Sequence, residues 1–385
     1  MKAQVRRVGR IMFSLYKLTA SLEKTIAGNR LSCPLSAALA SASSLHRAGL
    51  AIRNACYDHL PRLSRAASRP VISIGGIRAG GTGKTPVAAM IGEYLVSQGI
   101  GVAFLSRGYR RKDSACRIVL PGETVPWSAI GDEPALLHNR LPQSWLGIGA
   151  DRAKTADLLA PLLPRRSVFV LDDGFQHRAL RRDLDIICLH DSFLTDKLIP
   201  AGFLREGVSA LARARIALLI GPPRDAATLF RGRDLLASRF PHLYVSVVFQ
   251  ERGHWVNARD GRVSALPPLT APLLVCGIAR PGRFIDMVRS AGIVPCAELV
   301  FGDHHPFASA DFAPYRELLH NGIITTEKDA VRLSSLDVVQ AEKMWYLTIE
   351  MHFADSADKP AIYALIERAI RRRFTFCNDV FRYEN

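Results

Sequence analysis

Short apolar runs alternate with helix-length stretches from residue 71 onward. The runs are rich in Val, Ile and Leu and lack the polar alternation of a half-exposed strand. They predict strands at residues 71–74, 102–105, 168–171, 186–189, 216–220, 273–276, 323–325 and 345–349. The stretches between them predict helices. The pattern is therefore typical of the α/β class, with a parallel sheet covered by helices on both faces.

The same pattern divides the 385 residues into four segments. We expect a helical arm at residues 1–70, a larger α/β lobe at 71–240, a linker or ribbon at 241–270 and a smaller α/β lobe at 271–385. No internal repeat and no low-complexity tract interrupts this order.

The arm contains two stretches with helical spacing of apolar residues, at 5–26 and 35–57. In the second stretch Leu39, Ala42, Leu45, Gly49 and Ile52 share one face. Neither stretch has the ~20 uninterrupted apolar residues of a membrane span. We interpret both as amphipathic helices that lie on a membrane surface. Two alternatives remain: ordinary surface helices packed on the next lobe, or a cleaved targeting peptide in the first 30 residues.

Charge favours the membrane interpretation. The chain has a formal net charge of +16, and residues 1–70 carry 12 Lys or Arg against two acidic residues, which leaves only +6 for the rest. A basic body would indicate nucleic acid, whereas a basic arm indicates docking on an anionic surface. The seven cysteines form no CxxC pair, which is typical of reduced thiols without a zinc site or a disulfide framework.

A glycine-rich turn follows the first predicted strand and precedes a predicted helix. Its residues are Gly80, Gly81, Thr82, Gly83, Lys84 and Thr85. In such a turn backbone N–H groups surround phosphate oxygens, the Lys reaches the outer phosphates and the hydroxyl binds Mg²⁺. The strict pattern asks for Gly where Arg78 stands, but the strand–loop–helix context supports an ATP site of the P-loop type. The alternative without nucleotide binding is a glycine-rich turn before a helix, followed by Lys and Thr by chance.

Two carboxylates follow the strand predicted at 168–171, namely Asp172 and Asp173. An apolar strand that ends in an Asp delivers that side chain to the sheet edge, where Mg²⁺ and the γ-phosphate lie in P-loop enzymes. Alone, Asp-Asp-Gly is more often a turn. Next to the phosphate loop it predicts a metal site made of Thr85, Asp172 and Asp173.

Other polar clusters also lie near predicted strand ends. They are SRGY at 106–109, GDEP at 131–134, FQHR at 175–178, LRE at 204–206 and DHHP at 303–306. Loops at this edge of a parallel sheet commonly carry function. Taken singly, each cluster is better explained as loop or capping residues, and the His-His pair has no partner ligand at zinc spacing.

Together these motifs resemble the tetraacyldisaccharide 4′-kinases, the lipid A 4′-kinases. GGTGKTP, LSRGY, GDEP, LDDGFQHRALRRDLDI, PAG-x-LRE, GIARPGRF, DHHPF and TTEKDAVRL occur in that family's order from about residue 35 to the C-terminus. The resemblance implies transfer of the γ-phosphate of ATP, with Mg²⁺, to the 4′-hydroxyl of an acylated glucosamine disaccharide 1-phosphate. It also implies two lobes with the active site between them. The expected location is peripheral or monotopic, on the cytoplasmic face of a bacterial inner membrane.

Roles follow from the resemblance only where residues match. It implies that Asp132 is the catalytic base, that His304 pairs with it from the second lobe, and that Lys84 belongs to the catalytic phosphate loop. Arg205 and Glu206 match an active-site Arg-Glu pair. The expected partners are the lipid-linked disaccharide and anionic inner-membrane lipid, with no nucleic acid and no obligate protein partner.

This chain departs from the family in two places. Gly76 stands where an Asn is usual, and the N-terminus extends about 30 residues beyond what the family needs. A function from another class also remains open at this point. GGTGKT by itself permits a P-loop switch or partitioning ATPase that acts at the membrane, although the Lys that deviant-loop ATPases carry before the glycines is replaced by Ala79.

Overall fold

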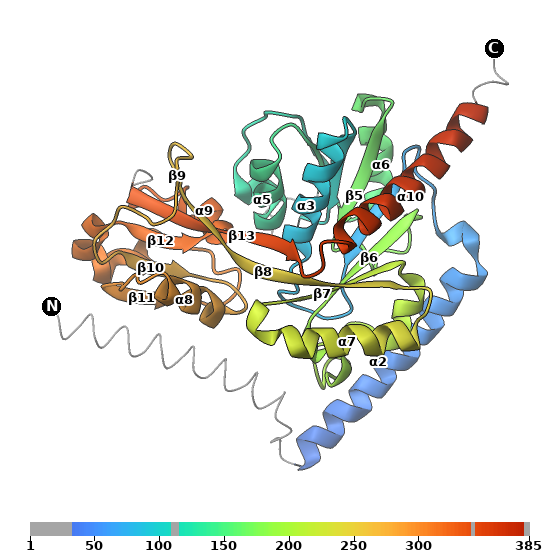
Figure 1. Ribbon diagram of the computed structural model, residues 1–385, viewed down its shortest axis with the longest axis horizontal. Coiled ribbons are helices and arrows are strands. Elements are labelled where there is room, and N and C mark those ends of the chain that lie inside the picture. The colour runs from blue at the N-terminus through green and yellow to red at the C-terminus, as the bar shows by residue number, and fades with distance from the viewer. Residues whose placement is uncertain (1–32, 109–114, 340–342, 381–385) are drawn as a thin grey trace. The chain divides into compact units, whose positions relative to one another are not determined.

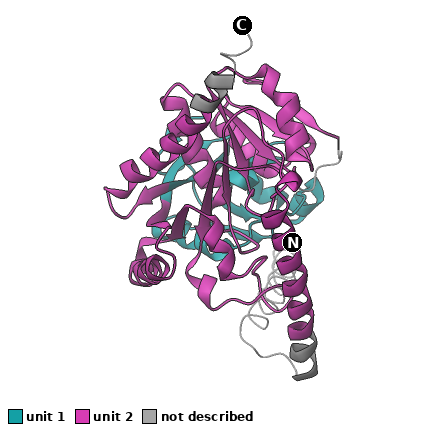
Figure 2. Ribbon diagram, turned by 90° about the vertical axis from the view of Figure 1, so that its right-hand side faces the viewer, with its two compact units in different colours: residues 1–31, 252–350 teal, residues 32–251, 351–385 magenta. Residues whose placement is uncertain are grey.

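The computed structural model describes residues 33–108, 115–339 and 343–380. Within it the chain forms two compact units, coloured separately in Figure 2. Among the described residues, unit 2 comprises 33–251 and 351–380, and unit 1 comprises 252–350. The helix predicted at 5–26 lies outside the described residues.

Unit 2 is built on a sheet in the order β8-β7-β6-β1-β5-β2-β4-β3, parallel except for β3 on β4 (Figure 1). Its strands are β1 Val71–Gly75, β2 Gly101–Ser106, β3 Arg117–Val119, β4 Trp145–Ile148, β5 Ser167–Asp172, β6 Leu184–Leu189, β7 Ile216–Gly221 and the first part of β8 Tyr244–Asn257. Its helices are α2 Cys33–His59, α3 Lys84–Ser97, α4 Trp127–Ile130, α5 Asp132–Arg140, α6 Arg152–Leu159, α7 Ala226–Arg239 and α10 Asp358–Val380.

The central strands β1, β5, β6 and β7 are buried along their whole length. Parallel strands covered on both faces need such continuous apolar runs, which explains why the sequence reveals them. One core cluster packs Ile187 and Leu219 against Leu229 and Leu236 of α7. Another packs Phe169 and its neighbours against α6. The two clusters hold the strands rigidly, and their carboxyl ends carry the loops described below.

Unit 1 contains a parallel sheet in the order β11-β10-β12-β13. Its elements are β9 Val263–Ser264, β10 Leu273–Cys276, β11 Ala297–Val300, β12 Ile323–Thr326, β13 Met344–Phe353, α8 Pro281–Ser290, the 3₁₀ segment Ser309–Asn321 and α9 Glu327–Leu333. The chain passes between the units within β8 and again within β13. The predicted ribbon at 241–270 corresponds to β8 and β9, which pair antiparallel.

The C-terminal helix α10 belongs to unit 2, whereas the sequence places it in the smaller lobe at 271–385. Its packing supplies the reason. Tyr363 of α10 stacks on Tyr94 of α3 with ring centroids 3.6 Å apart, and the Tyr94 hydroxyl donates to Glu367 at 2.5 Å. Packing contacts, and not the neighbouring elements in the sequence, therefore decide to which unit α10 belongs. The strands β3, β4 and β11 are three or four residues long, and runs this short give no clear strand pattern in the sequence.

Helix α2 (Figure 1) confirms the helix predicted at 35–57, but its polar and apolar faces are arranged unusually. Ala42, Leu45, Gly49 and Ile52 are exposed, with Leu45 at 77% and Ile52 at 68%. The side that faces the rest of unit 2 carries polar side chains, among them the buried Ser43, together with Leu50, which packs on the unit 2 core. An ordinary surface helix turns its apolar stripe to the core. None of the helices within the described ranges is long and apolar enough to cross a membrane.

Candidate phosphate and metal site

The phosphate loop follows β1 and opens α3, as the sequence predicts. Gly80 and Gly83 have φ of 89° and 78°, a region that side chains rarely adopt. A Cβ at Gly83 would also meet Ile220 at 3.2 Å, so this position requires glycine for two reasons. Arg78 replaces a glycine of the strict pattern, and its side chain is held by Asp196 at 2.8 Å. The loop therefore forms without that glycine.

The two acids end β5, the strand that pairs with β1 in parallel. Thr85 donates to Asp172 Oδ2 at 3.2 Å, and Lys84 Nζ lies 3.5 Å from Asp173 Oδ1. Arg205 donates two hydrogen bonds to Asp173, at 2.8 and 3.0 Å. The structure thus brings five residues of the predicted site together at the carboxyl edge of two neighbouring strands.

The two acids have opposite pKa shifts. Burial, reinforced by the charges of Glu133 and Asp173, raises the pKa of Asp172 to about 7. Burial also acts on Asp173, but Lys84 and Arg205 outweigh it and hold the pKa of Asp173 below its usual range. The site therefore holds one firmly ionised carboxylate and one carboxyl that ionises readily only when further positive charge arrives.

These residues fit a magnesium ion. Asp172 Oδ1 and Thr82 Oγ1 are buried and have no hydrogen-bond partner among the described residues. Orphaned buried oxygens are costly unless a ligand or ion meets them. Within the described ranges no cluster of three or more His, Cys, Asp or Glu side chains is arranged to hold a metal by itself. Thr85 and Asp172 are oxygen donors of the kind that hold Mg²⁺, which commonly takes one or two carboxylates together with substrate phosphates.

Asp132 is the first residue of α5 and is buried. Its carboxylate accepts the backbone N–H of Glu133 at 3.0 Å. The adjacent Glu133 is close enough for its charge to raise the pKa of Asp172. The GDEP motif therefore belongs to the surroundings of the two acids, within unit 2.

His304 lies in unit 1, in the turn after β11. Its φ of 58° is rare for a residue with a side chain. Its backbone N–H donates to Gly277 O at 3.1 Å, and its Nε2 lies 3.2 Å from Lys328 Nζ. The turn is thus a specified conformation, of the kind that structures maintain mainly at functional sites.

The TTEKDAVRL motif explains what maintains that turn. Thr326 caps α9 by accepting the N–H of Asp329. Asp329 and Arg332 form a fully buried ion pair, and Asp329 accepts the N–H of Gly277 at 2.9 Å. Arg332 donates to Gly277 O at 2.8 Å and to His305 O at 3.0 Å. The motif therefore fixes Gly277, whose carbonyl accepts from the His304 N–H, and the carbonyl of His305, which follows His304.

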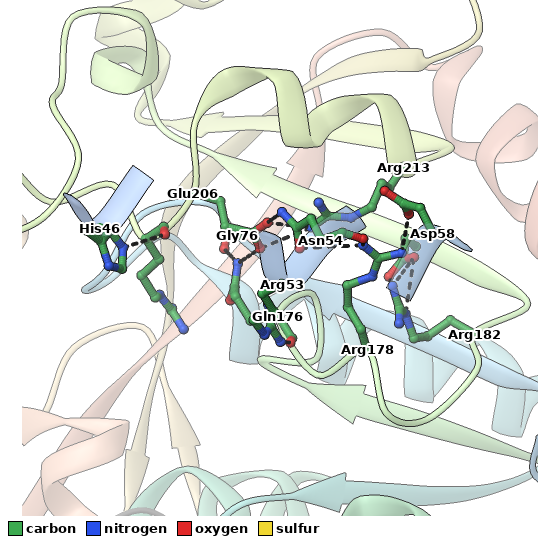
Figure 3. A network of polar contacts seen from close by, with 12 residues as sticks. His46, Arg53, Asn54, Asp58, Gly76, Gln176, Arg178, Arg182, Glu206 and Arg213 are labelled. Atoms are coloured by element: carbon green, nitrogen blue, oxygen red, sulfur yellow. Dashed lines mark hydrogen bonds and ion pairs between the residues drawn. The ribbon is translucent and has the colours of Figure 1, made fainter. Parts of the chain in front are cut away.

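Glu206 differs from its neighbour Arg205. Whereas Arg205 reaches the acids, Glu206 is 1% exposed and accepts hydrogen bonds from Arg213, Gln176 and Asn54 (Figure 3). Gln176 also donates to Gly76 O at 2.9 Å. Sequence reasoning treated Gln176 singly as a loop residue and missed Asn54, because nothing in a helix pattern marks an inward-facing Asn as a contact of the site.

The structure also accounts for Gly76. A Cβ there would lie 3.1 Å from Cys188 O and 3.3 Å from Thr82 Oγ1. Glycine leaves this space open at the start of the phosphate loop.

The cysteines whose side chains are described are free thiols, namely Cys56, Cys116, Cys188, Cys276 and Cys296.

Comparison with known proteins identifies the family. Residues 35–371 match the family described as tetraacyldisaccharide-1-P 4′-kinase. The chain belongs to this family. A tetraacyldisaccharide 4′-kinase of Anaeromyxobacter dehalogenans is 35% identical over 342 residues, which cover 84% of this chain and 88% of that protein. One of Porphyromonas gingivalis strain W83 is 31% identical over 350 residues, which cover 84% of this chain and 94% of that protein.

A solved structure agrees with these relatives. The crystal structure of LpxK from Aquifex aeolicus in complex with ATP superposes with a TM-score of 0.73 at 29% identity. The match covers 87% of this chain and 99% of that one. Family membership confirms the predicted α/β P-loop fold, the prediction of an enzyme, and the predicted class of ATP-dependent kinase in lipid A biosynthesis. The switch or partitioning ATPase rested on GGTGKT alone and loses its support.

His177 provides a pH test of the packing around the site. Arg152 donates to His177 Nδ1 at 3.4 Å, and burial together with this charge lowers the pKa of His177 to about 4. Between pH 6.5 and 4 the unfolded chain therefore binds the proton more readily, so stability falls as the pH drops through this window. Between pH 7.5 and 5 the free energy of unfolding should fall by about 1 kcal/mol less in the His177→Gln variant than in the unmodified protein, a difference kept small because solvent partly screens the half-buried His177.

Urea denaturation of both proteins at the two pH values measures this difference. His242→Gln, a substitution of the same kind at an exposed position, serves as the matched control. Parallel stability curves for the His177→Gln variant and the unmodified protein would contradict the argument.

Proposed function

We propose that this chain transfers the γ-phosphate of ATP to the 4′-hydroxyl of an acylated glucosamine disaccharide 1-phosphate. The observation that carries the proposal is the joint placement of Lys84, Thr85, Asp172, Asp173 and Arg205 at the carboxyl edge of β1 and β5. Phosphoryl transfer requires positioning and charge neutralisation, which this arrangement provides. Relatives named tetraacyldisaccharide 4′-kinase support the choice of acceptor.

Each residue has a part in that proposal. The phosphate-loop amides and Lys84 hold the outer phosphates of ATP. Thr85 and Asp172 hold Mg²⁺, which when bound neutralises phosphate charge, and Asp173 is oriented by Arg205. Asp132 accepts the proton of the sugar hydroxyl late in the step, because a hydroxyl is a weak nucleophile. His304 assists Asp132 by orienting its carboxylate or relaying the proton.

We also propose that the enzyme works on the cytoplasmic face of a bacterial inner membrane. The outward apolar face of α2 supports this, because exposed Leu and Ile on a helix favour an apolar surrounding. The basic residues of segment 1–70 support an anionic lipid surface. We retain the predicted arm at 1–70, the kinase lobe at 71–240 and the linker at 241–270. The second lobe, predicted at 271–385, is shortened at its C-terminal end, because α10 packs on unit 2.

The acceptor is tested by transfer of ³²P from ATP to a defined tetraacyldisaccharide 1-phosphate, followed by mapping of the phosphorylated position. The unmodified protein should label the 4′-position. Lys84→Ala should lower the rate by ~10²-fold or more, because it removes the charge that follows the migrating phosphate. Lys154→Ala, at an exposed position of α6, serves as the control. A Lys84→Ala variant of nearly unchanged rate would overturn the P-loop assignment.

A double-mutant cycle tests the proposed roles of Asp132 and His304. If they handle one proton together, Asp132→Asn combined with His304→Gln should be little slower than the poorer single variant, since residues that act as a unit are not additive. Rate constants under saturating ATP and lipid give the coupling. Fully additive losses would show that the two residues act separately.

Vesicle co-sedimentation tests the membrane surface. Leu45→Asn with Ile52→Asn should reduce binding at high and low salt alike, because burial of apolar area is not screened. Deletion of residues 1–30 should remove mainly a salt-sensitive part, at about 1 kcal/mol per basic residue near the surface. Mixtures of anionic and neutral lipid provide the comparison. Equal binding by all three chains would argue against α2 and the arm as the membrane contact.

A further inference from the structure

Helix α2 docks on unit 2 through hydrogen bonds from its polar face (Figure 3). Ser43 donates to Leu198 O at 2.9 Å, and His46 Nε2 lies 3.3 Å from Arg205 O. Two turns further along, Arg53 donates to Gln176 O and Asn54 donates to Glu206 Oε2. Hydrogen bonds are directional, so they specify where the helix sits more than they stabilise it.

Several of these bonds end on segments of the phosphate site. Glu206 accepts from Asn54 at 3.1 Å, from Gln176 at 3.1 Å and from Arg213 at 2.9 and 3.0 Å. Both carboxylate oxygens are thereby engaged in a place where water does not reach. A buried carboxylate that loses one hydrogen-bond donor either moves or is left with an oxygen lone pair that has no donor. The position of Glu206 therefore depends on Asn54.

Two paths lead from Glu206 to the reacting groups. Through Gln176 it is connected to Gly76 O, at the start of the phosphate loop, by a bond of 2.9 Å. Through the chain it is connected to Arg205, whose N–H donates to Ile77 O at 2.6 Å and whose side chain holds Asp173. A shift of Glu206 is transmitted to the phosphate loop on one path and to a site carboxylate on the other.

We propose that Asn54 is a positioning residue for the phosphotransfer site, acting through Glu206 and Gln176 on the phosphate loop. This rests on the proposed function for its kinetic consequence, whereas its consequence for nucleotide binding stands by itself. Helix α2 then has two tasks on opposite faces. Its outward face meets the surroundings, and its inward face orders the residues that receive ATP.

The test replaces Asn54 by Leu, which has a similar volume and no donor. ATP affinity is measured without any acceptor by titration with a fluorescent ATP analogue, and kcat and KM for the lipid are measured in detergent micelles. We expect ATP affinity to fall several-fold and kcat to fall about tenfold, the factor that corresponds to one lost positioning bond, with KM for the lipid unchanged.

Two controls separate positioning from loss of stability. Within the described residues Ser44 donates only to Ala40 O of its own helix, so Ser44→Ala should change neither quantity. Asp58 forms an ion pair with Arg178 at 2.6 Å and does not contact Glu206, so Asp58→Ala should loosen the docking of α2 with a smaller effect on ATP affinity. Thermal melting of every variant shows whether the losses follow stability.

Unchanged ATP affinity and kcat in the Asn54→Leu variant would overturn the proposal. The proposal would also be overturned if Asn54→Leu and Asp58→Ala lost ATP affinity and kcat to the same extent, in proportion to the fall of their melting temperatures. Should the Leu variant fail to fold, Asn54→Asp replaces it, since this nearly isosteric side chain sets a carboxylate against Glu206. If the unmodified protein binds ATP but labels no lipid, the proposed function fails while the affinity measurement still decides the role of Asn54.

Discussion

The burial of negative charge at the carboxyl edge of β1 and β5 is the constraint that organises unit 2. Asp172 is buried and the adjacent Asp173 is half-buried, and two neighbouring carboxylates with so little water around them cannot both ionise without compensation. Lys84 and Arg205 stabilise the charge of Asp173, and a proton or a cation must meet that of Asp172. The site is thus arranged in advance for a phosphate ligand, and Asp172 is the carboxyl whose charge the proposed Mg²⁺ would neutralise.

Glu206 is a second buried charge, and it is handled differently. Arg213 neutralises it, while the amides of Asn54 and Gln176 complete its hydrogen bonding. A charge that is fully paired inside the protein is unsuited to binding a metal, but it is well suited to fixing several segments at once. The adjacent residues Arg205 and Glu206 therefore have different roles. Arg205 contacts Asp173, whereas Glu206 connects helix α2 to the turn at Gln176 and, through it, to the phosphate loop.

A buried pair of charges also fixes the backbone conformation around His304 in unit 1. The buried pair Asp329–Arg332 bonds to both polar groups of the Gly277 backbone and to His305 O. A helix this short is a weak unit alone, so capping by Thr326 and the ion pair replace the contacts that a longer helix would make. The motif TTEKDAVRL thereby explains how a histidine with φ of 58° keeps its conformation.

The sequence alone determined the parallel strands, the phosphate loop and the acids Asp172 and Asp173, because continuous apolar runs and fixed spacings in a strand–loop–helix unit are local properties. Its motifs also determined the family. The tertiary structure decided which side of α2 faces outward, where α10 packs and that Asn54 supports Glu206. These depend on which surfaces remain after the sheet has formed, and such contacts join residues more than 100 positions apart, for which a local pattern carries no signal.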